Sequence, residues 1–228
     1  MSDRPLSCRK LGKRLSLSKD TIWRWRLRIL EALGKVSDQS FTGIVEADET
    51  HQRESRKGSR EWVNHERNPA AYPEPNRRPW YEYTGGRMKM KRGLSRFQLP
   101  ILTVMDRSGQ LLFERIKNRS VPVIEAALRD LVAPDVVLCS DGAAAYAKFC
   151  SKRGHPHYVL GSKPGTRVIE GAFHIQTVNS VHSRYSAFIR PFCGPASKYL
   201  SRYLAWFLAQ SKMTATEVFR TVLDREAL

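Results

Sequence analysis

The sequence has no long apolar segment and few cysteines. No apolar run reaches the length of about 18 residues that a membrane-spanning helix needs, and residues 1–4 are too polar for a signal peptide. The four cysteines are scattered without a Cys-x-x-Cys pair, so a zinc site is not indicated. Cys139 lies inside an apolar run and is interpreted as a small buried hydrophobe. We therefore expect a cytosolic protein that spans no membrane.

Acidic residues are scarce relative to basic ones. The chain has 22 Asp and Glu against 39 Lys and Arg, which gives a net charge of +17. Residues 1–35 and residues 53–96 each carry an excess of +7, so these two blocks hold 14 of the 17 excess charges. Two basic blocks beside a near-neutral remainder indicate surfaces that face a polyanion, most plausibly nucleic acid. A basic membrane-surface patch is less favoured, because no amphipathic anchor accompanies the charge.

Two short apolar runs each lead to an aspartate. Residues 136–142 end in Asp141 and a glycine before a small-residue helix signal, and residues 43–50 contain Asp48. Buried strands show this pattern, and open α/β sheets place ligands at the carboxyl ends of their strands. Two aspartates at one sheet edge would suit Mg²⁺ or Mn²⁺, which prefer oxygen ligands. The alternative is that both residues cap strand-to-helix turns.

The first basic block has the pattern of two helices joined by a short turn. Apolar residues recur at helical spacing on both sides of residues 16–18, and Ser18 is a good N-cap for the second helix. This pattern predicts a helix-turn-helix within residues 1–35. Its second helix would direct four side chains toward a major groove, namely Lys19, Thr21, Arg24 and Arg28. The alternative is a helical hairpin with a solvated basic face.

The second basic block, residues 53–96, lacks any periodicity. Its length and composition predict a functional insertion or a partly disordered arm. Arginines alternate there with tryptophan and tyrosine, which can pair with phosphates and stack on bases. A plain surface loop is the alternative interpretation.

The elements between this block and the C-terminus predict a mixed α/β fold. Strands are expected at residues 99–104 and 111–116, joined by a hairpin turn, and helices at residues 121–131 and 143–153. One strand, two hairpin-linked strands, a helix and a further strand follow one another in the order of a ribonuclease-H-like (integrase-type) fold. In that fold the first and fourth strands are neighbours, which would bring Asp48 beside Asp141.

Six stretches together carry a resemblance to a known family. They are residues 9–30, 44–50, 91–95, 140–142, 174–184 and 197–207. The most specific is residues 174–184, His-Ile-Gln-Thr-Val-Asn-Ser-Val-His-Ser-Arg. In these stretches the chain resembles bacterial insertion-sequence transposases of the DDE type. The closest subgroup has a zinc ribbon, a helix-turn-helix and a catalytic domain whose third catalytic residue is Glu or Asn.

The resemblance implies a catalytic site and a reaction. Asp48, Asp141 and Asn179 match the three catalytic residues of a ribonuclease-H-like domain over residues 43–210, which would leave residues 211–228 as a tail. Two Mg²⁺ or Mn²⁺ ions about 4 Å apart would be held there, with Asp48 bridging both. The chain would cleave DNA strands at insertion-sequence ends and transfer them to a target, using water first and a DNA 3′-hydroxyl second.

The resemblance also implies contacts and partners around this site. DNA-binding residues are expected at Lys91, Arg92 and Arg184. His182 would orient a phosphate or the nucleophile, or would be structural. The partners would be double-stranded DNA, both element ends and target, and further copies of the chain, in the cytoplasm and nucleoid of a bacterium.

Two acidic residues near the expected ligands have open roles. Glu49, together with Glu46, flanks Asp48 and would either support the metal ligands or act as a cap. Glu170 is a rival third carboxylate, although it lies in an expected loop.

Two features depart from the family pattern. No zinc ribbon precedes the expected helix-turn-helix, and Ser186 stands where a basic residue usually follows the third catalytic position. These departures favour an alternative, a truncated and non-catalytic DNA-binding remnant or regulator of transposition. A metal-dependent nuclease or resolvase on the same fold is a third hypothesis, and the expected helix-turn-helix counts against it.

Overall fold

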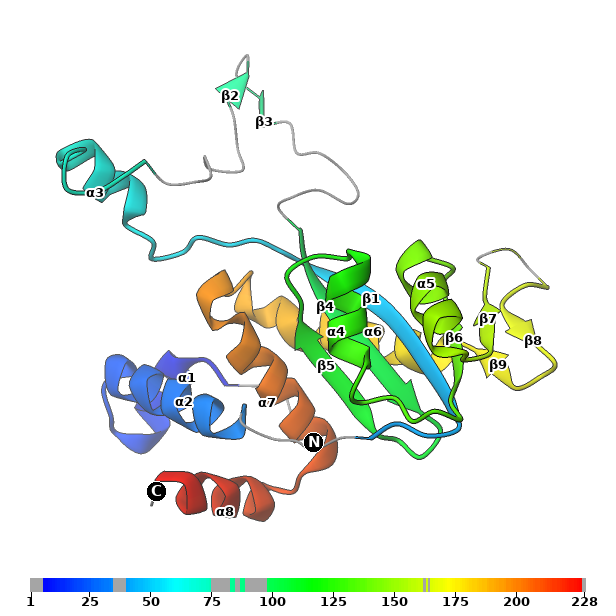
Figure 1. Cartoon of the computed structure of the whole chain (residues 1–228). Coiled ribbons are helices and arrows are strands. Elements are labelled where there is room, and N and C mark those ends of the chain that lie inside the picture. Colours follow the sequence, from blue (N-terminus) through cyan, green and yellow to red (C-terminus); the bar gives the residue numbers. More distant parts are fainter. Residues whose placement is uncertain are drawn as a thin grey trace.

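A five-stranded mixed sheet forms the centre of the molecule (Figure 1). A computed structural model describes residues 6–34, 40–74, 83–84, 87–88, 98–161, 163 and 165–226. The strand order is β5-β4-β1-β6-β7. The bounds are Ile44–Arg53 for β1, Gln98–Asp106 for β4, Leu111–Arg115 for β5, Val137–Ser140 for β6 and His157–Val159 for β7.

The pairing directions confirm the fold class predicted from the sequence. β1 pairs with β4 in antiparallel fashion, and β4 pairs with β5 in the same way. On its other side β1 runs parallel to β6, which runs parallel to β7. β1 therefore lies between the antiparallel β4–β5 hairpin and the parallel strand β6, which is the arrangement of a ribonuclease-H-like sheet. The strand that contains Asp48, β1, and the strand that precedes Asp141, β6, are neighbours, as expected.

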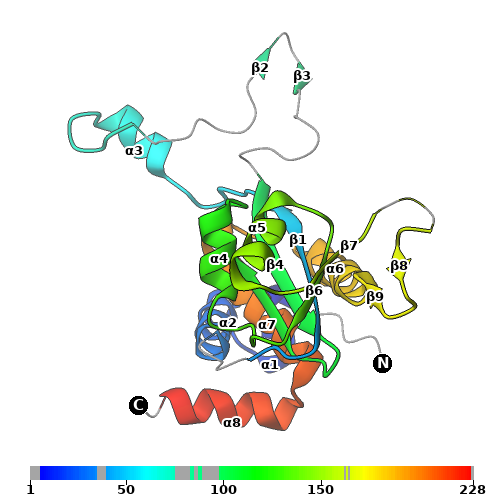
Figure 2. The ribbon, with the colours of Figure 1, turned by 45° about the vertical axis from the view of Figure 1, so that its right-hand side comes forward.

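Helices cover both faces of this sheet (Figure 2). On one face α4 (Val121–Leu128) and α5 (Ala144–Arg153) pack on a cluster that includes Val45, Ala47 and Leu138. On the other face α6 (Gln176–Ile189) and α7 (Leu200–Lys212) pack on a cluster that includes Ile101 and Phe113. Alternate residues of a strand point to opposite faces, so β1 can serve both layers.

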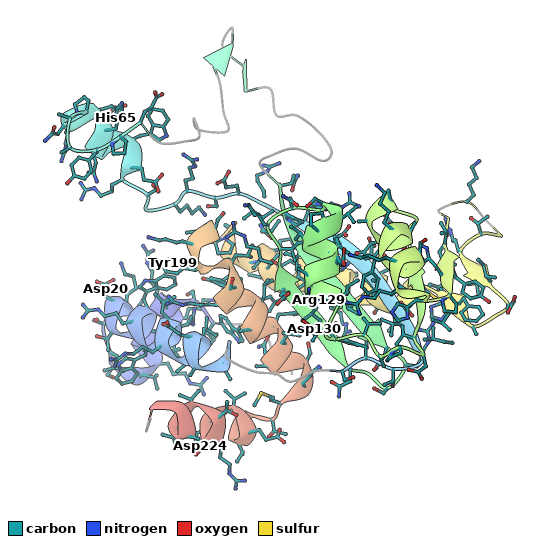
Figure 3. The ribbon with its side chains drawn as sticks, viewed as in Figure 1. Asp20, His65, Arg129, Asp130, Tyr199 and Asp224 are labelled. Atoms are coloured by element: carbon teal, nitrogen blue, oxygen red, sulfur yellow. The ribbon has the colours of Figure 1, made fainter. Side chains whose placement is uncertain are left out.

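The N-terminal helices pack on the C-terminal ones. α1 (Cys8–Leu15) and α2 (Lys19–Leu33) are joined by the predicted three-residue turn, and the Ser18 side chain accepts a hydrogen bond from the Thr21 backbone N at 3.0 Å. The Trp23 ring meets the edge of Tyr199 at 5.5 Å between centroids, beside α7 (Figure 3). The residues expected to form a tail contain α8 (Ala215–Glu226), which also contacts α2.

The second basic block leaves the main body at the end of β1 (Figure 1). Its described parts include α3 (Glu61–Arg67) and the short strands β2 (Tyr83–Thr84) and β3 (Arg87–Met88). Hydrogen bonds attach the start of this segment to the body, because Ser55 and Ser197 exchange two of them at 2.7 and 2.8 Å. Lys91 and Arg92 lie outside the described residues.

The remaining elements surround the start of α6. A small hairpin of β8 (Val168–Ile169) and β9 (Phe173–His174) precedes it. Two 3₁₀ turns, Arg190–Phe192 and Ser197–Tyr199, connect α6 with α7. Across the described part of the chain, no helix is both long and apolar enough to cross a membrane.

Candidate active site

Asp48 and Asp141 occupy neighbouring positions where β6 ends beside the middle of β1, and this place is called the sheet edge below. Ala47 of β1 is paired with Ser140 of β6 in parallel register, and the next residues in the chain are Asp48, within β1, and Asp141, directly after the end of β6. Gly142 then turns the chain away with φ of +83°, a left-handed conformation that favours glycine. A Cβ atom at this position would lie only 2.6 Å from Val159 Cγ1. The strand pairing and the Asp-Gly turn thus bring the two carboxylates together.

Each aspartate has one oxygen bound to the backbone and one without a hydrogen bond. Asp48 Oδ1 accepts from Glu49 N at 2.7 Å, and Asp141 Oδ1 accepts from Ala143 N at 3.1 Å. The second oxygen of each is 3.9 Å from a basic nitrogen, of His182 or Arg119, which is too long for a hydrogen bond. Within the described part of the chain, these two oxygens keep their capacity to bind a cation.

The site raises the pKa of Asp48 to about 6. Burial is the largest cause, and the nearby negative charges of Asp141 and Glu49 add to it. The hydrogen bond from Glu49 N and the positive charge of Arg119 act in the opposite direction. Two acids that disfavour each other's charge are a natural site for a divalent cation, which removes the repulsion.

Glu46 attaches the start of α6 to β1. Its side chain is fully buried, and its two oxygens accept hydrogen bonds from Thr177 Oγ1 at 2.7 Å and Val178 N at 3.0 Å. Arg107 pairs with the same carboxylate, and His174 Nδ1 lies 3.1 Å from it. A carboxylate at a helix N-terminus satisfies free backbone N–H groups and interacts favourably with the helix dipole. Of the two roles expected for Glu46, support of the metal ligands or a cap, these contacts show that it caps the start of α6.

α6 brings Asn179 and His182 to the same side of the sheet as Asp48. His182 Nε2 is hydrogen-bonded to Thr103 Oγ1 at 2.8 Å, and its Nδ1 is 3.9 Å from Asp48 Oδ2. Asn179 is exposed and lies one helical turn before His182, so both project from one face of α6. The Asn179 backbone N donates to Ile175 O at 3.0 Å, whereas its side-chain amide makes no hydrogen bond among the described residues. Its carbonyl oxygen is therefore available as a ligand.

His182 is held in its neutral form. Burial lowers its pKa to about 4, and the nearby His51 contributes to this shift. The hydrogen bond to Thr103, a fully buried residue of β4, links α6 to the sheet. This bond favours the structural interpretation of His182.

Glu49 points to the opposite face of β1 from Asp48. Its Oε1 accepts a 2.7 Å hydrogen bond from Tyr146 Oη of α5, and its Oε2 accepts one of 2.7 Å from Arg119 Nε. Both donors are side chains, so Glu49 caps no helix. Nothing in the sequence indicated Tyr146 or Arg119, because these residues lie 97 and 70 positions away from Glu49.

The donor set fits an oxygen-ligated cation. Among the residues that the structure describes, no three His, Cys, Asp or Glu side chains are grouped to hold a metal. The Asp48 and Asp141 carboxylates are the acidic donors here, and hard cations such as Mg²⁺ and Mn²⁺ accept such oxygens. Glu170 lies in the exposed turn between β8 and β9, and no described contact joins it to either aspartate.

The DNA-binding residues expected on α2 lie mostly on its exposed side. Lys19, Arg24 and Arg28 are exposed, while Thr21 is half-buried and its hydroxyl is hydrogen-bonded to Ser18 Oγ at 2.8 Å. The opposite side of α2 packs on α7 and α8. Arg24 and Arg28 are four residues apart and so share one exposed face, while Lys19 is exposed at the start of the helix, and all three can reach an external polyanion.

The basic residue expected on α6 is also exposed. Arg184 is open to solvent two residues after His182. Ser186, where a basic residue was expected from the resemblance, donates its hydroxyl hydrogen bond to His182 O at 2.8 Å.

Comparisons with known proteins identify a family. Residues 81–208, more than half of the chain, match the model of the ISXO2-like transposase domain. This range includes Asp141 and Asn179 and leaves Asp48 outside. No curated protein matches the sequence.

Among solved structures, one match is the crystal structure of a pre-cleavage Mos1 transpososome. It is 12% identical, with 97% of this chain and 75% of that chain covered and a TM-score of 0.29. This similarity is too low to support an inference about the site.

Proposed function

This chain belongs to the ISXO2-like transposase family, and we propose that it cuts DNA strands at the ends of an insertion sequence and joins them to a target. The observation that carries the proposal is the aspartate pair. Asp48 and Asp141 lie on neighbouring strands, and each keeps one carboxylate oxygen without a hydrogen bond in the described part of the chain. A pair of carboxylates of this kind supports the proposal because it can hold the divalent cations that assist phosphoryl transfer.

Three residues would hold the cations. Asp48 and Asp141 would bind them through carboxylate oxygens, and Asn179 would offer its side-chain amide oxygen. Two bound divalent cations activate an attacking oxygen and stabilise the leaving oxygen of an in-line displacement. An amide oxygen is uncharged, so we expect Asn179 to hold a cation more weakly than a glutamate at the same position would. Mg²⁺ fits this set, and Mn²⁺ would substitute for it.

The supporting residues keep these ligands in place. Glu46 determines where α6 begins, and Asn179 immediately follows Val178, whose backbone N binds Glu46. His182, neutral near pH 7, links the next turn of α6 to Thr103. We propose that both residues position Asn179 relative to Asp48 and transfer no proton in the reaction.

The DNA would lie across the basic surfaces. Lys19 at the start of α2, together with Arg24 and Arg28 on its exposed face, would bind element ends, and Arg184 would contact DNA near the aspartates. Phosphate contacts from such residues contribute affinity that weakens with salt. On family membership alone, we further propose that the chain acts as a homo-oligomer and in the cytoplasm.

A cleavage assay tests the proposal. The purified chain is incubated with Mg²⁺ and a DNA fragment that carries its element end, beside Asp48→Asn and the matched control Asp130→Asn. Asp130 is an exposed carboxylate next to Arg129 on the outer surface (Figure 3). We expect the wild type and the control to cut the end, and Asp48→Asn to bind DNA without cutting it. Equal cleavage by Asp48→Asn would refute the metal site, and binding without cleavage by every variant would favour the non-catalytic remnant.

A further inference from the structure

Arg119 reaches the aspartate pair from the side of the sheet opposite α6. It lies in the loop between β5 and α4, and its Nη2 is 3.9 Å from Asp141 Oδ2. Its positive charge partly offsets the burial that raises the pKa of Asp48, and it adds to the burial that lowers the pKa of His51. Arg119 therefore stands within electrostatic range of both aspartates, although no motif in the sequence marks it.

A buried carboxylate holds Arg119 in this position. Glu49 accepts the hydrogen bond from Arg119 Nε, and the side chain of Glu49 is 1% exposed whereas that of Arg119 is 29% exposed. The hydroxyl of Tyr146, a fully buried residue, fixes the other oxygen of Glu49. Ion pairs of this kind contribute little net stability because desolvation offsets their attraction. What the arrangement does provide is a defined orientation of the guanidinium.

The outer part of this guanidinium remains available. Its Nε is occupied by Glu49, and within the described residues its Nη1 and Nη2 make no hydrogen bond. A planar guanidinium with two adjacent N–H groups matches the geometry of two phosphate oxygens. The open side of Arg119 thus lies at the edge where the proposed reaction needs a phosphate.

The charges at this edge also favour a phosphate contact. Asp48, Asp141 and Glu49 are acidic, and Arg119 is the cation closest to them among the described residues. Cations on the two aspartates would turn the net charge of the edge positive. A fixed guanidinium beside them would then attract the phosphodiester, and it requires no rearrangement to do so.

We propose that Arg119 binds the non-bridging oxygens of the phosphodiester that the enzyme cuts, through its Nη1 and Nη2 groups. The proposal rests on the function proposed above and adds a substrate-binding residue to it. The competing interpretation is that Arg119 serves only as the counter-ion of Glu49. The two interpretations differ in one respect: only a phosphate contact makes the DNA affinity of Arg119 depend on the negative charge of that phosphate.

A binding experiment separates them. The full chain is titrated, in Ca²⁺, with two duplexes that carry the element end. One has an ordinary phosphate at the boundary between element and flank, and the other has an uncharged methylphosphonate there. We expect the wild type to bind the methylphosphonate duplex about tenfold more weakly, the effect of losing one charged hydrogen-bonding partner. Arg119→Ala should bind both duplexes within about twofold of each other.

The matched control is Arg129→Ala. Arg129 is an exposed arginine at the end of α4, 54% exposed and paired only with its neighbour Asp130 among described residues. This variant should keep the tenfold discrimination. The proposal is overturned if Arg119→Ala discriminates as well as the wild type does, or if the wild type binds the two duplexes equally.

A double variant removes the risk that Arg119→Ala fails to fold. In Glu49→Gln/Arg119→Ala neither charge remains, and the glutamine can still accept the Tyr146 hydrogen bond. We expect this variant to melt near the wild-type temperature and still show no discrimination. Restored discrimination would establish Arg119 as a counter-ion only.

The outcome for Arg119 is distinct from the outcome for the proposed function. The binding experiment requires no catalysis. Suppose that the wild type discriminates between the duplexes but cuts no DNA, with Mg²⁺ or with Mn²⁺. This result would refute strand cleavage and support the phosphate contact. A wild type that cuts, beside an Arg119→Ala variant with full discrimination, would refute the phosphate contact alone.

Discussion

Replacing Glu46 with alanine should destabilise the chain and detach the start of α6. The lost interactions are the hydrogen bonds from Thr177 Oγ1 and Val178 N and the pairing with Arg107. Hydrogen bonds to a charged group contribute about 1.5–3 kcal/mol each, and removing one partner of a buried charge pair costs about 3–5 kcal/mol. Arg107 is 35% exposed, so water can replace part of its lost contact. We expect a loss of about 3–5 kcal/mol in the free energy of unfolding.

Urea unfolding followed by circular dichroism measures this loss of free energy, and thermal unfolding followed in the same way measures the melting temperature. For a chain of this size, the melting temperature should fall by roughly 6–20 °C. The matched control is Glu31→Ala, because Glu31 is 59% exposed and pairs with Arg202 on the surface. A surface pair of this kind contributes at most about 1 kcal/mol. A loss no larger for Glu46→Ala than for the control would refute the role of Glu46 in holding α6.

Two further predictions concern cations and DNA. Binding of Mn²⁺, measured by electron paramagnetic resonance, should strengthen as the pH rises through about 6, because burial raises the pKa of Asp48 to that value and only the deprotonated carboxylate binds a cation well. In the absence of cations the sign for stability is opposite: a carboxyl whose pKa is raised in the folded state stabilises the fold at low pH and loses that contribution as the pH rises through about 6. Mn²⁺ affinity that does not change between pH 5 and 7 would contradict the assignment of Asp48 as a ligand. Arg28→Ala should reduce the slope of log affinity against log salt by about 1 for DNA with the element end, because one phosphate contact is lost. Arg129→Ala is the control and should leave the slope unchanged. A slope for Arg28→Ala equal to that of the control would exclude Arg28 from the DNA contact.

Local sequence patterns were sufficient to predict much of the fold. The apolar run before Asp141 became β6, and the Ser18 cap and the turn before it appeared as predicted. Boundaries were less accurate, since the helix expected over residues 121–131 ends at Leu128. Beyond Leu128 the chain turns to form a bridge between Val132 and Phe41, a contact with a distant segment that no local pattern contains.

The candidate site was predictable only in part. Asp48 and Asp141 stood out because each follows an apolar run, and Asn179 because it lies in a family motif. Arg119 and Tyr146 had no such signal, since one lies in a polar loop and the other in an ordinary helix. Their importance comes from Glu49, which binds both of them across three separate elements.

By itself, the sequence determined the features that depend on neighbouring residues: apolar strands, helix caps, two basic blocks and a family motif. Burial within one element follows from periodicity, so these features could be inferred from short windows. Only the tertiary structure decided which side chains meet at the sheet edge. The register that pairs Ala47 with Ser140 joins positions 93 residues apart, and the attachment of α6 to Glu46 joins positions 132 apart. Such contacts arise because each buried polar group must find a partner wherever the packing of separate elements places one.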